Sequence, residues 1–360
     1  MRNEIRYFSM FTGVGGFELG LENTRNKSNL QRRWIENSRS IQSLQSKGSE
    51  SSNETIPLSC VGCSEIDKYA SELLNQKFPN IKNWGDCTRI NPRELPDFDM
   101  LCGGFPCQSF SVAGKRKGFE DTRGTMFFEI ARILEVKRPR LVFLENVKGL
   151  LNHEGGKTFT KIIQTLEELG YSVQWMVLNS KFFGVPQNRE RVFIIGSLRG
   201  ERRPEILPFS RNVREVNEEH KEARQIIQVD DVARENKHKL GDRLKEDGAT
   251  FTLNSIEQRG IIDGSAIYDD YNQRMRTDGI AGTLTQNTGS KAERNGQKLV
   301  DGISIRRLTP RECERLQGFP DNWTNIKTNN GKIMSDSQRY KMMGNAVTVN
   351  VVKAIGQKLK

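Results

Sequence analysis

Short apolar runs alternate with amphipathic segments from the N-terminus to about Leu198. Short apolar runs bounded by turn-forming residues predict buried strands, and an apolar period near 3.6 residues predicts a helix. Strands are expected at residues 5–11, 58–64, 98–102, 141–144, 172–178 and 191–197, and helices at 17–22, 68–78, 126–136 and 157–169. This alternation predicts an α/β fold with a doubly wound, mostly parallel sheet.

The chain after Leu198 is more polar, richer in turn-forming residues and less periodic, which predicts a second, smaller domain. Thr309-Pro310-Arg311-Glu312 has the pattern of a capping box with proline in the first helical turn. A last helix is expected over residues 347–358.

Residues 24–57 are rich in Ser, Asn, Gln, Lys and Arg and separate the first expected helix from the second expected strand. This composition predicts a solvated polar insertion. Alternatively, Leu30, Trp34, Ile41 and Leu44 give part of it a weak helical face for DNA or a partner.

The formal net charge of +11 and the isoelectric point near 9.4 suggest a polyanionic partner, with nucleic acid first, although a solvated basic surface would have the same charge. No apolar run has the length of a membrane span, and the N-terminus does not resemble a signal peptide. We therefore expect a cytoplasmic protein without a membrane partner, in which the six cysteines need not pair.

Four groups of residues follow four expected strands, at the carboxyl ends where open α/β sheets bind ligands. They are the glycine turn at residues 11–16, Glu65, Cys107, and Glu145-Asn146-Val147. An acid after the second strand, such as Glu65, can hold ribose hydroxyls. The dinucleotide pattern G-x-G-x-x-G fails because Glu18 stands at its third glycine, so a dehydrogenase is a minor alternative.

Cys107 lies in the glycine- and proline-flanked stretch GGFPCQSFS, which favours an exposed, reactive thiol. The other cysteines are expected to be buried and inert: Cys60, Cys63, Cys87, Cys102 and Cys313. Cys60 and Cys63 have C-x-x-C spacing without a second ligand pair, so no metal site is expected.

Gln187, Arg189 and Arg191 alternate along the expected start of a strand, so a period of two directs them to one face. Two arginines and a glutamine before a buried run indicate an anionic or carbonyl-rich ligand. Glu190 would face away from them.

The stretches FTGVGG, GFPCQSFS, ENV, QNRER and GNAV occur in this order, and together they resemble the DNA (cytosine-5) methyltransferase family. The resemblance covers nearly the whole chain except residues 24–57 and the middle of 199–305. The chain has no Pro-Pro pair and thus no Asn/Asp-Pro-Pro-Tyr/Phe motif, which disfavours methylation of an amino group.

The resemblance implies a Rossmann-like, S-adenosylmethionine-dependent methyltransferase fold with a smaller target-recognition domain. Residues 1–198 and 338–360 would form the catalytic and cofactor-binding domain, and 199–337 the target-recognition domain. The implied reaction is methyl transfer to carbon 5 of a cytosine turned out of duplex DNA.

Carbon 5 of cytosine is a poor nucleophile, and a thiolate added at carbon 6 makes it enamine-like. The resemblance implies this role for Cys107, with Glu145 as the acid at ring nitrogen 3 and Asn146 as a positioning residue. Arg191 would approach the base carbonyl, and Arg189 would help to favour the thiolate.

The same resemblance implies the binding residues. S-adenosylmethionine would be held by Phe11, Thr12, Gly13, Gly15, Gly16, Glu65, Ile66, Asp86, Cys87, Phe105, Asn345 and Val347. DNA would be contacted by Ser109, Ser111, Lys115, Arg116, Lys117, Arg274, Arg276, Gln286 and Asn287.

The first hypothesis is therefore a sequence-specific DNA cytosine-5 methyltransferase of the compact bacterial or phage type. It is expected to be a monomer, associated with the nucleoid through DNA, with a cognate restriction endonuclease acting separately. A tRNA cytosine-5 methyltransferase on the same scaffold and a non-catalytic DNA-binding relative are the alternatives, although the presence of Cys107, Glu145 and Arg191 argues against the latter.

Overall fold

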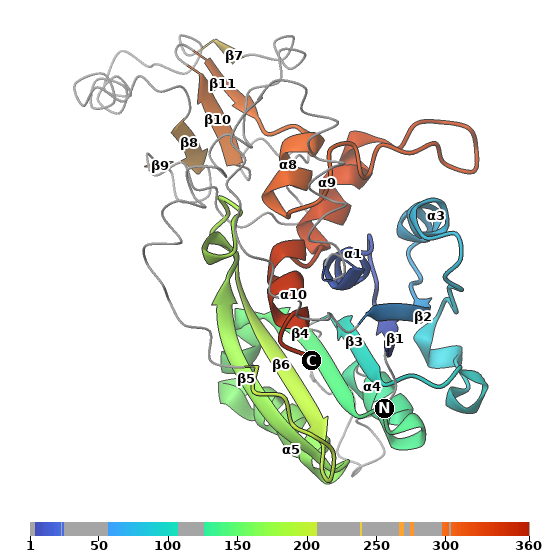
Figure 1. Cartoon of the computed structure of the whole chain (residues 1–360). Coiled ribbons are helices and arrows are strands. Elements are labelled where there is room, and N and C mark those ends of the chain that lie inside the picture. Colours follow the sequence, from blue (N-terminus) through green and yellow to red (C-terminus); the bar gives the residue numbers. More distant parts are fainter. Residues whose placement is uncertain are drawn as a thin grey trace, which may run out of the picture.

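The computed structural model describes residues 4–22, 24, 57–106, 126–206, 238–239, 266–269, 274–276, 297–301 and 304–359. Six strands form the larger sheet, in the order β2-β1-β3-β4-β6-β5 (Figure 1). Their bounds are β1 Ile5–Met10, β2 Leu58–Ser64, β3 Met100–Gly104, β4 Leu141–Val147, β5 Tyr171–Asn179 and β6 Glu190–Leu198.

The first four strands of this sheet are parallel, whereas β6 runs antiparallel to both of its neighbours, β4 and β5. The predicted α/β class with a mostly parallel sheet is confirmed. Because β6 is reversed, its first residues lie at the edge of the sheet where β1 to β4 end. Every candidate site residue on these strands can therefore gather at one edge.

Helices cover both faces of this sheet. The α-helices are α1 Gly16–Glu22, α3 Lys68–Lys77, α4 Met126–Lys137, α5 Lys157–Glu168, α8 Pro310–Leu316, α9 Asp336–Asn345 and α10 Val349–Gly356. Short 3₁₀ segments are η1 Cys87–Arg89, η2 Pro92–Glu94, η4 Lys148–Gly156 and η5 Ser180–Phe182.

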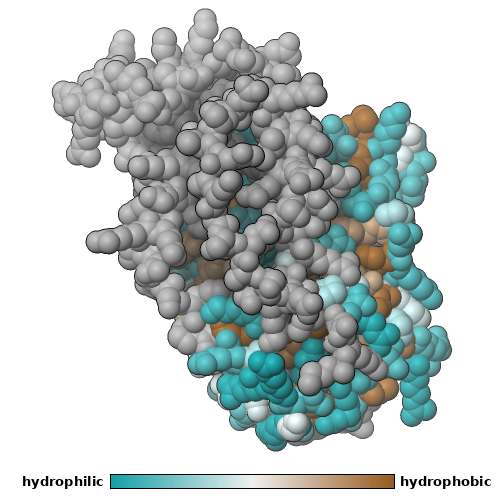
Figure 2. Space-filling view, in the orientation of Figure 1, coloured by the Kyte–Doolittle hydropathy of each residue, from teal (hydrophilic) through white to brown (hydrophobic). Residues whose placement is uncertain are grey.

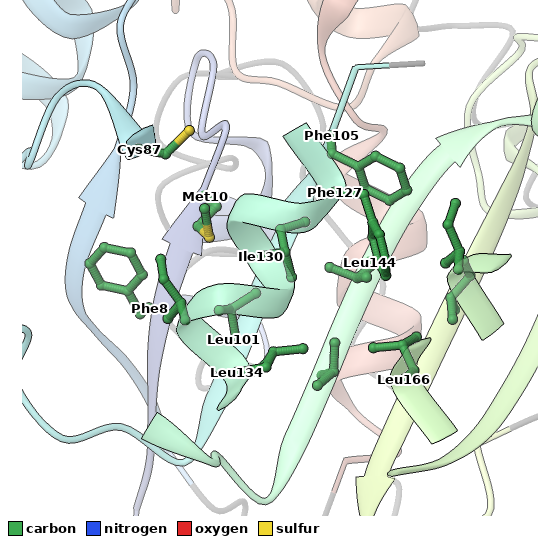
Figure 3. Close-up of a cluster of buried hydrophobic side chains, with 14 of the residues drawn as sticks. Phe8, Met10, Cys87, Leu101, Phe105, Phe127, Ile130, Leu134, Leu144 and Leu166 are labelled. Atoms are coloured by element: carbon green, nitrogen blue, oxygen red, sulfur yellow. The ribbon is translucent and has the colours of Figure 1, made fainter. Parts of the chain in front are cut away.

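Alternate strand residues enter different cores, as the period of a strand requires. Phe8, Leu101 and Leu144 pack with α4 and α5 on one face (Figure 3). Tyr7 and Phe143 pack with α1 and α10 on the other face. Both faces are thus buried, which explains the nearly continuous apolar runs in the sequence.

Helix α10 and Val347 just before it pack against the first helix, α1, at glycines of α1. A Cβ atom at Gly16 would lie 2.7 Å from Cγ1 of Val347, and one at Gly20 would lie 2.6 Å from Cγ1 of Val352. Real Cβ atoms do not approach so closely, so the glycines permit this contact. The two ends of the chain therefore build one core.

A third cluster joins α3, α8 and α9 to the start of the chain. Leu19 of α1 and Leu73 of α3 lie in it with Leu316, Trp323 and Met343. The indole nitrogen of Trp323 donates to the carbonyl oxygen of Val14 at 2.9 Å. Residues 308–334 thus pack with α1 and α3, although the sequence analysis expected them in the second domain.

Within the described ranges, five short strands form a second sheet in the order β7-β11-β10-β8-β9 (Figure 1). They are β7 His238–Lys239, β8 Ala266–Asp269, β9 Arg274–Arg276, β10 Gln297–Asp301 and β11 Ser304–Arg307. Neighbouring strands are antiparallel throughout. This sheet lies within the polar region that the sequence analysis separated from the rest.

Most predicted element boundaries lie within a few residues of the observed ones, and the capping box at Thr309 and Glu312 is confirmed. The expected fourth strand was too short, because β4 continues to Val147 and contains Glu145 rather than preceding it. The last helix begins at Val349, not at 347. Helix α9 was missed because its sequence, DSQRYKMMGN, has no regular apolar period.

None of the helices in the described ranges is long and apolar enough to cross a membrane. On the face drawn in Figure 2, hydrophilic residues cover most of the part of the surface that the structure describes, with smaller hydrophobic areas between them.

Gly20→Ala is expected to destabilise the protein. The higher helix propensity of alanine would by itself stabilise α1 by about 1 kcal/mol, but the packing cost is larger. The added methyl group must displace Val352, and such overpacking costs roughly 1–3 kcal/mol. Urea unfolding should show the loss, whereas Glu135→Ala at an exposed position of α4 should leave stability within about 0.5 kcal/mol of the parent. Equal stability of the two variants would contradict the close packing of α1 on α10.

Candidate active site

An ion pair between β4 and β6 lies at the centre of the candidate site. Val147 is paired with Arg191 in the antiparallel register, so Glu145 lies diagonally across from the arginine on the same face. Arg191 Nε is 3.1 Å from Glu145 Oε1, and the two side chains are 14% and 11% exposed. The pair is therefore largely removed from water.

Gly104, at the end of β3, makes room for the carboxyl group of Glu145. The two residues are neighbours in the parallel register of β3 and β4. A Cβ atom at position 104 would lie 2.9 Å from Glu145 Oε2, closer than such contacts allow. The glycine therefore determines where the carboxyl group can lie, a role that the sequence analysis missed. Its only sequence signal is the second glycine of the GGFPC stretch.

Burial raises the pKa of Glu145 above its ordinary value, and the positive charges of Arg191 and Arg189 oppose this rise. Burial also lowers the pKa of Arg191, while Glu145 opposes that change. The ordinary pKa of a guanidinium group is so far above neutrality that Arg191 remains charged near neutral pH despite this decrease. The site thus holds an acid with an increased affinity for a proton beside a permanent positive charge.

Asn146 holds the chain that leads to Cys107. Its Nδ2 donates to the carbonyl oxygen of Phe105 at 2.9 Å, and its Oδ1 accepts from the amide of Val147 at 2.8 Å. Phe105 is buried and lies 5.6 Å from Phe127, measured between ring centroids. The segment after β3 is therefore fixed beside Glu145 up to Pro106, while Cys107 lies outside the described residues.

Gln187 and Arg189 bind the protein's own carbonyl groups. Gln187 Nε2 donates to the carbonyl oxygen of Leu316 at 3.0 Å. Arg189 Nη2 donates to the carbonyl oxygens of Gly344 and Ala346, at 3.1 and 2.8 Å. The sequence analysis expected these two residues to face a ligand rich in carbonyl groups. In the structure they bind carbonyl groups of the chain itself. Arg189 is also close enough to influence Glu145 electrostatically.

Glu190 faces away from this group, as the alternation predicted. Its carboxylate is exposed and accepts from Lys148 Nζ at 2.8 Å. Both partners are about half exposed, so this pair contributes little to stability.

The glycine turn after β1 is bonded to Glu65. The amide of Gly13 donates to Glu65 Oε2 and that of Asp67 donates to Oε1, each at 2.7 Å. Phe11 has a φ of 54°, Gly13 of 59° and Gly15 of 83°. Positive φ is strained for a phenylalanine, and such strain is concentrated at functional sites. The turn is therefore shaped by contacts across the ends of β1 and β2.

Open space borders this turn. A Cβ atom at Gly13 or at Gly85 would have no neighbour within 4 Å. Ile66 beside them is 72% exposed, and Asn345 is exposed as well. An exposed apolar side chain, a carboxylate and open glycine backbone fit a nucleoside, because the first can cover a base and the second can accept from ribose hydroxyls. The residues present thus fit the adenosyl part of S-adenosylmethionine.

The side chains of several other predicted cofactor residues contact the protein itself. Cys87 is buried, with its sulfur atom 4.0 Å from that of Met126. Val347 packs on Gly16, and Thr12 Oγ1 donates to Ser9 Oγ at 3.2 Å. Asp86 accepts from the amide of Thr88 at 2.9 Å, which caps η1. Their roles toward the cofactor stay predictions.

Most of the predicted DNA-contacting residues lie outside the described ranges: Ser109, Ser111, Lys115, Arg116, Lys117, Gln286 and Asn287. Arg274 and Arg276 are the first and last residues of β9 in the second sheet. The roles of all nine residues stay predictions.

The five cysteines that the structure describes are free thiols, of which Cys60 is partly buried and the others are buried. Burial raises the pKa of each, for example that of Cys87 to about 11. They are therefore protonated and poor nucleophiles near neutrality. Within the described ranges, no group of three or more His, Cys, Asp or Glu residues could hold a metal ion.

Comparison with known proteins adds independent evidence. The profile of the family described as C-5 cytosine-specific DNA methylase matches residues 5–360. The chain is 36% identical over 363 residues to the Type II methyltransferase M.HhaI of Haemophilus parahaemolyticus, covering 98% of this chain and 93% of that protein. It is 33% identical over 370 residues to the Type II methyltransferase M.HpaII of Haemophilus parainfluenzae, covering 100% and 90%.

The fold has solved counterparts. The crystal structure of the S. pombe Dnmt2 methyltransferase superposes with a TM-score of 0.60, covering 98% of each chain at 18% sequence identity. At this identity the likeness concerns the fold.

Arg191→Met should destabilise the protein in a pH-dependent way. The substitution leaves Glu145 buried without its nearest positive charge, and breaking such a pair costs about 3–5 kcal/mol when the remaining group stays ionised. The pKa of Glu145 in the folded protein is already raised and should rise further. Its protonated form fits the site, so stability relative to the parent should recover as pH falls below that pKa and decline as pH rises through it.

Urea unfolding of parent and variant at pH 5.5 and pH 8.5 measures this difference. The double variant Glu145→Gln/Arg191→Met has no carboxyl group to titrate and should lose the pH dependence. An equal loss of stability at both pH values in Arg191→Met would contradict the pairing.

Proposed function

This chain belongs to the C-5 cytosine-specific DNA methylase family and is a DNA cytosine-5 methyltransferase that uses S-adenosylmethionine. We propose that Cys107, Glu145 and Arg191 carry out its reaction. The observation on which the proposal rests is the buried Glu145–Arg191 pair, 3.1 Å apart at the carboxyl edge of the sheet. Asn146, next to Glu145, donates to the carbonyl oxygen of Phe105, two residues before Cys107 in the sequence. This bond supports the proposal that Cys107 acts beside the acid and the permanent cation.

Cys107 is the nucleophile of this proposal. Its thiolate adds to carbon 6 of the target cytosine, which converts carbon 5 into an enamine-like nucleophile. Carbon 5 then takes the methyl group that the sulfonium centre of S-adenosylmethionine supplies. Loss of the carbon 5 proton to a base such as water, followed by departure of the Cys107 thiolate, restores the aromatic ring. Since the base cannot be reached inside a duplex, it must first be turned out of the stack.

Glu145 and Arg191 stabilise the charge that develops on the ring. Addition at carbon 6 places negative charge on the ring, and a proton donated by Glu145 to nitrogen 3 relieves it. Burial prepares Glu145 for this role because it raises the pKa of the carboxyl group. Arg191 holds the carboxyl group in place and presents its positive charge toward the base carbonyl.

Arg189 is a positioning residue in this proposal. Its guanidinium group is buried and bonded to the carbonyl oxygens of Gly344 and Ala346. Its charge contributes to the field around Glu145 and to that around the thiolate. The turn that it holds carries Asn345, one of the predicted cofactor residues.

The cofactor is held at the neighbouring strand ends. Glu65 would accept from the ribose hydroxyls, Ile66 would cover the adenine, and the turn at residues 11–16 would lie against the donor. The open space at Gly13 and Gly85 supports this placement.

In this proposal, the polar region that contains the second sheet recognises the DNA sequence. Residues 308–334 pack with α1 and α3, so we place the boundary of the target-recognition domain near Leu308 instead of at residue 337. The two relatives named above are Type II methyltransferases, and a cognate restriction endonuclease acting on the same site is part of the proposal. The proposal also includes a monomeric state and a cytoplasmic location.

Covalent trapping tests the mechanism directly. Duplex DNA with 5-fluorocytosine at the target position cannot lose a proton from carbon 5, so the adduct with Cys107 should persist when S-adenosylmethionine is present. A linked protein–DNA species should appear on a denaturing gel, and peptide mapping should place the link at Cys107. Cys107→Ala should abolish both the link and methylation but keep binding of DNA and cofactor. Methylation at an undiminished rate in that variant would refute the role of Cys107.

Glu145→Gln should slow the chemical step by about 10²- to 10⁴-fold, because an amide cannot deliver a proton in the transition state. Single-turnover methylation with saturating DNA and cofactor measures this step, and DNA affinity should change far less. Glu190→Gln is the matched control, since Glu190 lies nearby on β6 but points away toward Lys148. Equal rates in the two variants would remove Glu145 from the mechanism.

A further inference from the structure

Residues 344–348, which we call the turn, run from the last two residues of α9 to the residue before α10 and carry the exposed Asn345 between buried residues on both sides. It borders the proposed cofactor pocket, because Val347 packs directly on Gly16. Arg189 holds the carbonyl oxygens of Gly344 and Ala346 inside the turn.

Gln317, directly after α8, binds both ends of the same turn. Its Nε2 donates to the carbonyl oxygen of Met343 at 3.0 Å, before the turn. Its Oε1 accepts from Thr348 Oγ1 at 2.9 Å, and its carbonyl oxygen accepts from the amide of Val349 at 3.0 Å, after the turn. The side chain is fully buried, so water does not compete for these bonds.

Hydrogen bonds and an ion pair join helix α8, which precedes Gln317, to helix α9. Glu314 of α8 and Arg339 of α9 form a buried ion pair with a separation of 3.2 Å. Glu314 also accepts from the amide of Thr324 at 2.9 Å, and Arg339 Nε donates to Thr324 Oγ1 at 3.0 Å. Helices α8 and α9 therefore cannot shift independently, and a bond from Gln317 to the turn fixes the turn relative to both.

The two hydrogen bonds of the Gln317 side-chain amide go to the two ends of the turn, one to Met343 and one to Thr348. An apolar side chain of similar size would fill the same volume next to Leu316 and Met343. Such a replacement would leave the carbonyl oxygen of Met343 and the hydroxyl of Thr348 without the bonds that Gln317 makes to them. The amide therefore fixes the geometry of the turn through both groups.

We infer that Gln317 is a positioning residue for S-adenosylmethionine, which holds the turn at residues 344–348 in the shape that closes the cofactor pocket. This inference rests on the proposed function. Gln317 does not itself reach the pocket, and its effect passes through the backbone on either side of Asn345.

Isothermal titration of S-adenosylmethionine into the full-length protein, without DNA, tests the inference. Gln317→Leu should weaken cofactor binding at least about 10-fold, because both side-chain bonds to the turn are lost. Thr348→Val removes only the bond to Oε1 and should weaken binding about 2- to 10-fold, as expected for one hydrogen bond. The milder variant keeps the test valid if Gln317→Leu does not fold.

Thr309→Ala is the matched control. Thr309 caps the opposite end of the same helix, where its side chain accepts from the amide of Glu312. Its loss should lower the melting temperature without changing cofactor affinity by more than about 2-fold. A loss of affinity in Thr309→Ala equal to that in Gln317→Leu would reduce Gln317 to a stabilising role and overturn the inference.

Two further measurements separate positioning from general damage. The double variant Gln317→Leu/Thr348→Val should bind the cofactor no more weakly than Gln317→Leu alone, because both substitutions break the same bond. In steady-state methylation, KM for S-adenosylmethionine should rise while kcat at saturating cofactor stays within about 3-fold of the parent.

Parent-like affinity in both Gln317→Leu and Thr348→Val would refute the inference and leave the proposed function intact. Failure of the parent protein to bind S-adenosylmethionine would instead refute the proposed function. The two failures are therefore distinguishable.

Discussion

The Glu145–Arg191 pair depends on the reversal of a single strand. In an entirely parallel sheet, a strand that follows β5 would begin at the edge opposite to the site. Because β6 runs antiparallel between β4 and β5, its first residues reach the end of β4. A buried carboxylate without a positive neighbour is costly while it is ionised, so this strand order lowers the cost of burying Glu145. The chemistry of the site then follows from the burial.

The C-terminal segment closes the molecule around this edge. Val347 and helix α10 pack on Gly16 and Gly20 of α1, and the turn before α10 is held by Arg189 and Gln317. Arg189 stands two residues before Arg191 on the same segment. One stretch of backbone therefore supports both the turn that carries Asn345 and the Glu145–Arg191 pair. In the proposed mechanism, this shared support places cofactor binding next to the base chemistry.

Burial has opposite consequences for the acid and for the thiols. It raises the pKa of Glu145, which makes the carboxyl group a better proton donor near neutrality. It also raises the pKa of the thiols of Cys60 and Cys102 on the strands, which keeps them protonated and unreactive. Cys107, the proposed nucleophile, follows the buried Phe105 by two residues and lies outside the described residues.

The sequence alone determined the sheet class, most strands and helices, the capped start of α8 and the family, because local apolar periods and short motifs carry that information. It also placed Glu65 at the glycine turn and turned Glu190 away from Arg191. It could not show that β6 is antiparallel, that Arg189 and Gln187 bind the chain's own carbonyl groups, or that Gly104 makes room for Glu145. These features join residues distant in sequence, and only the packing of strands and helices decides which of them meet.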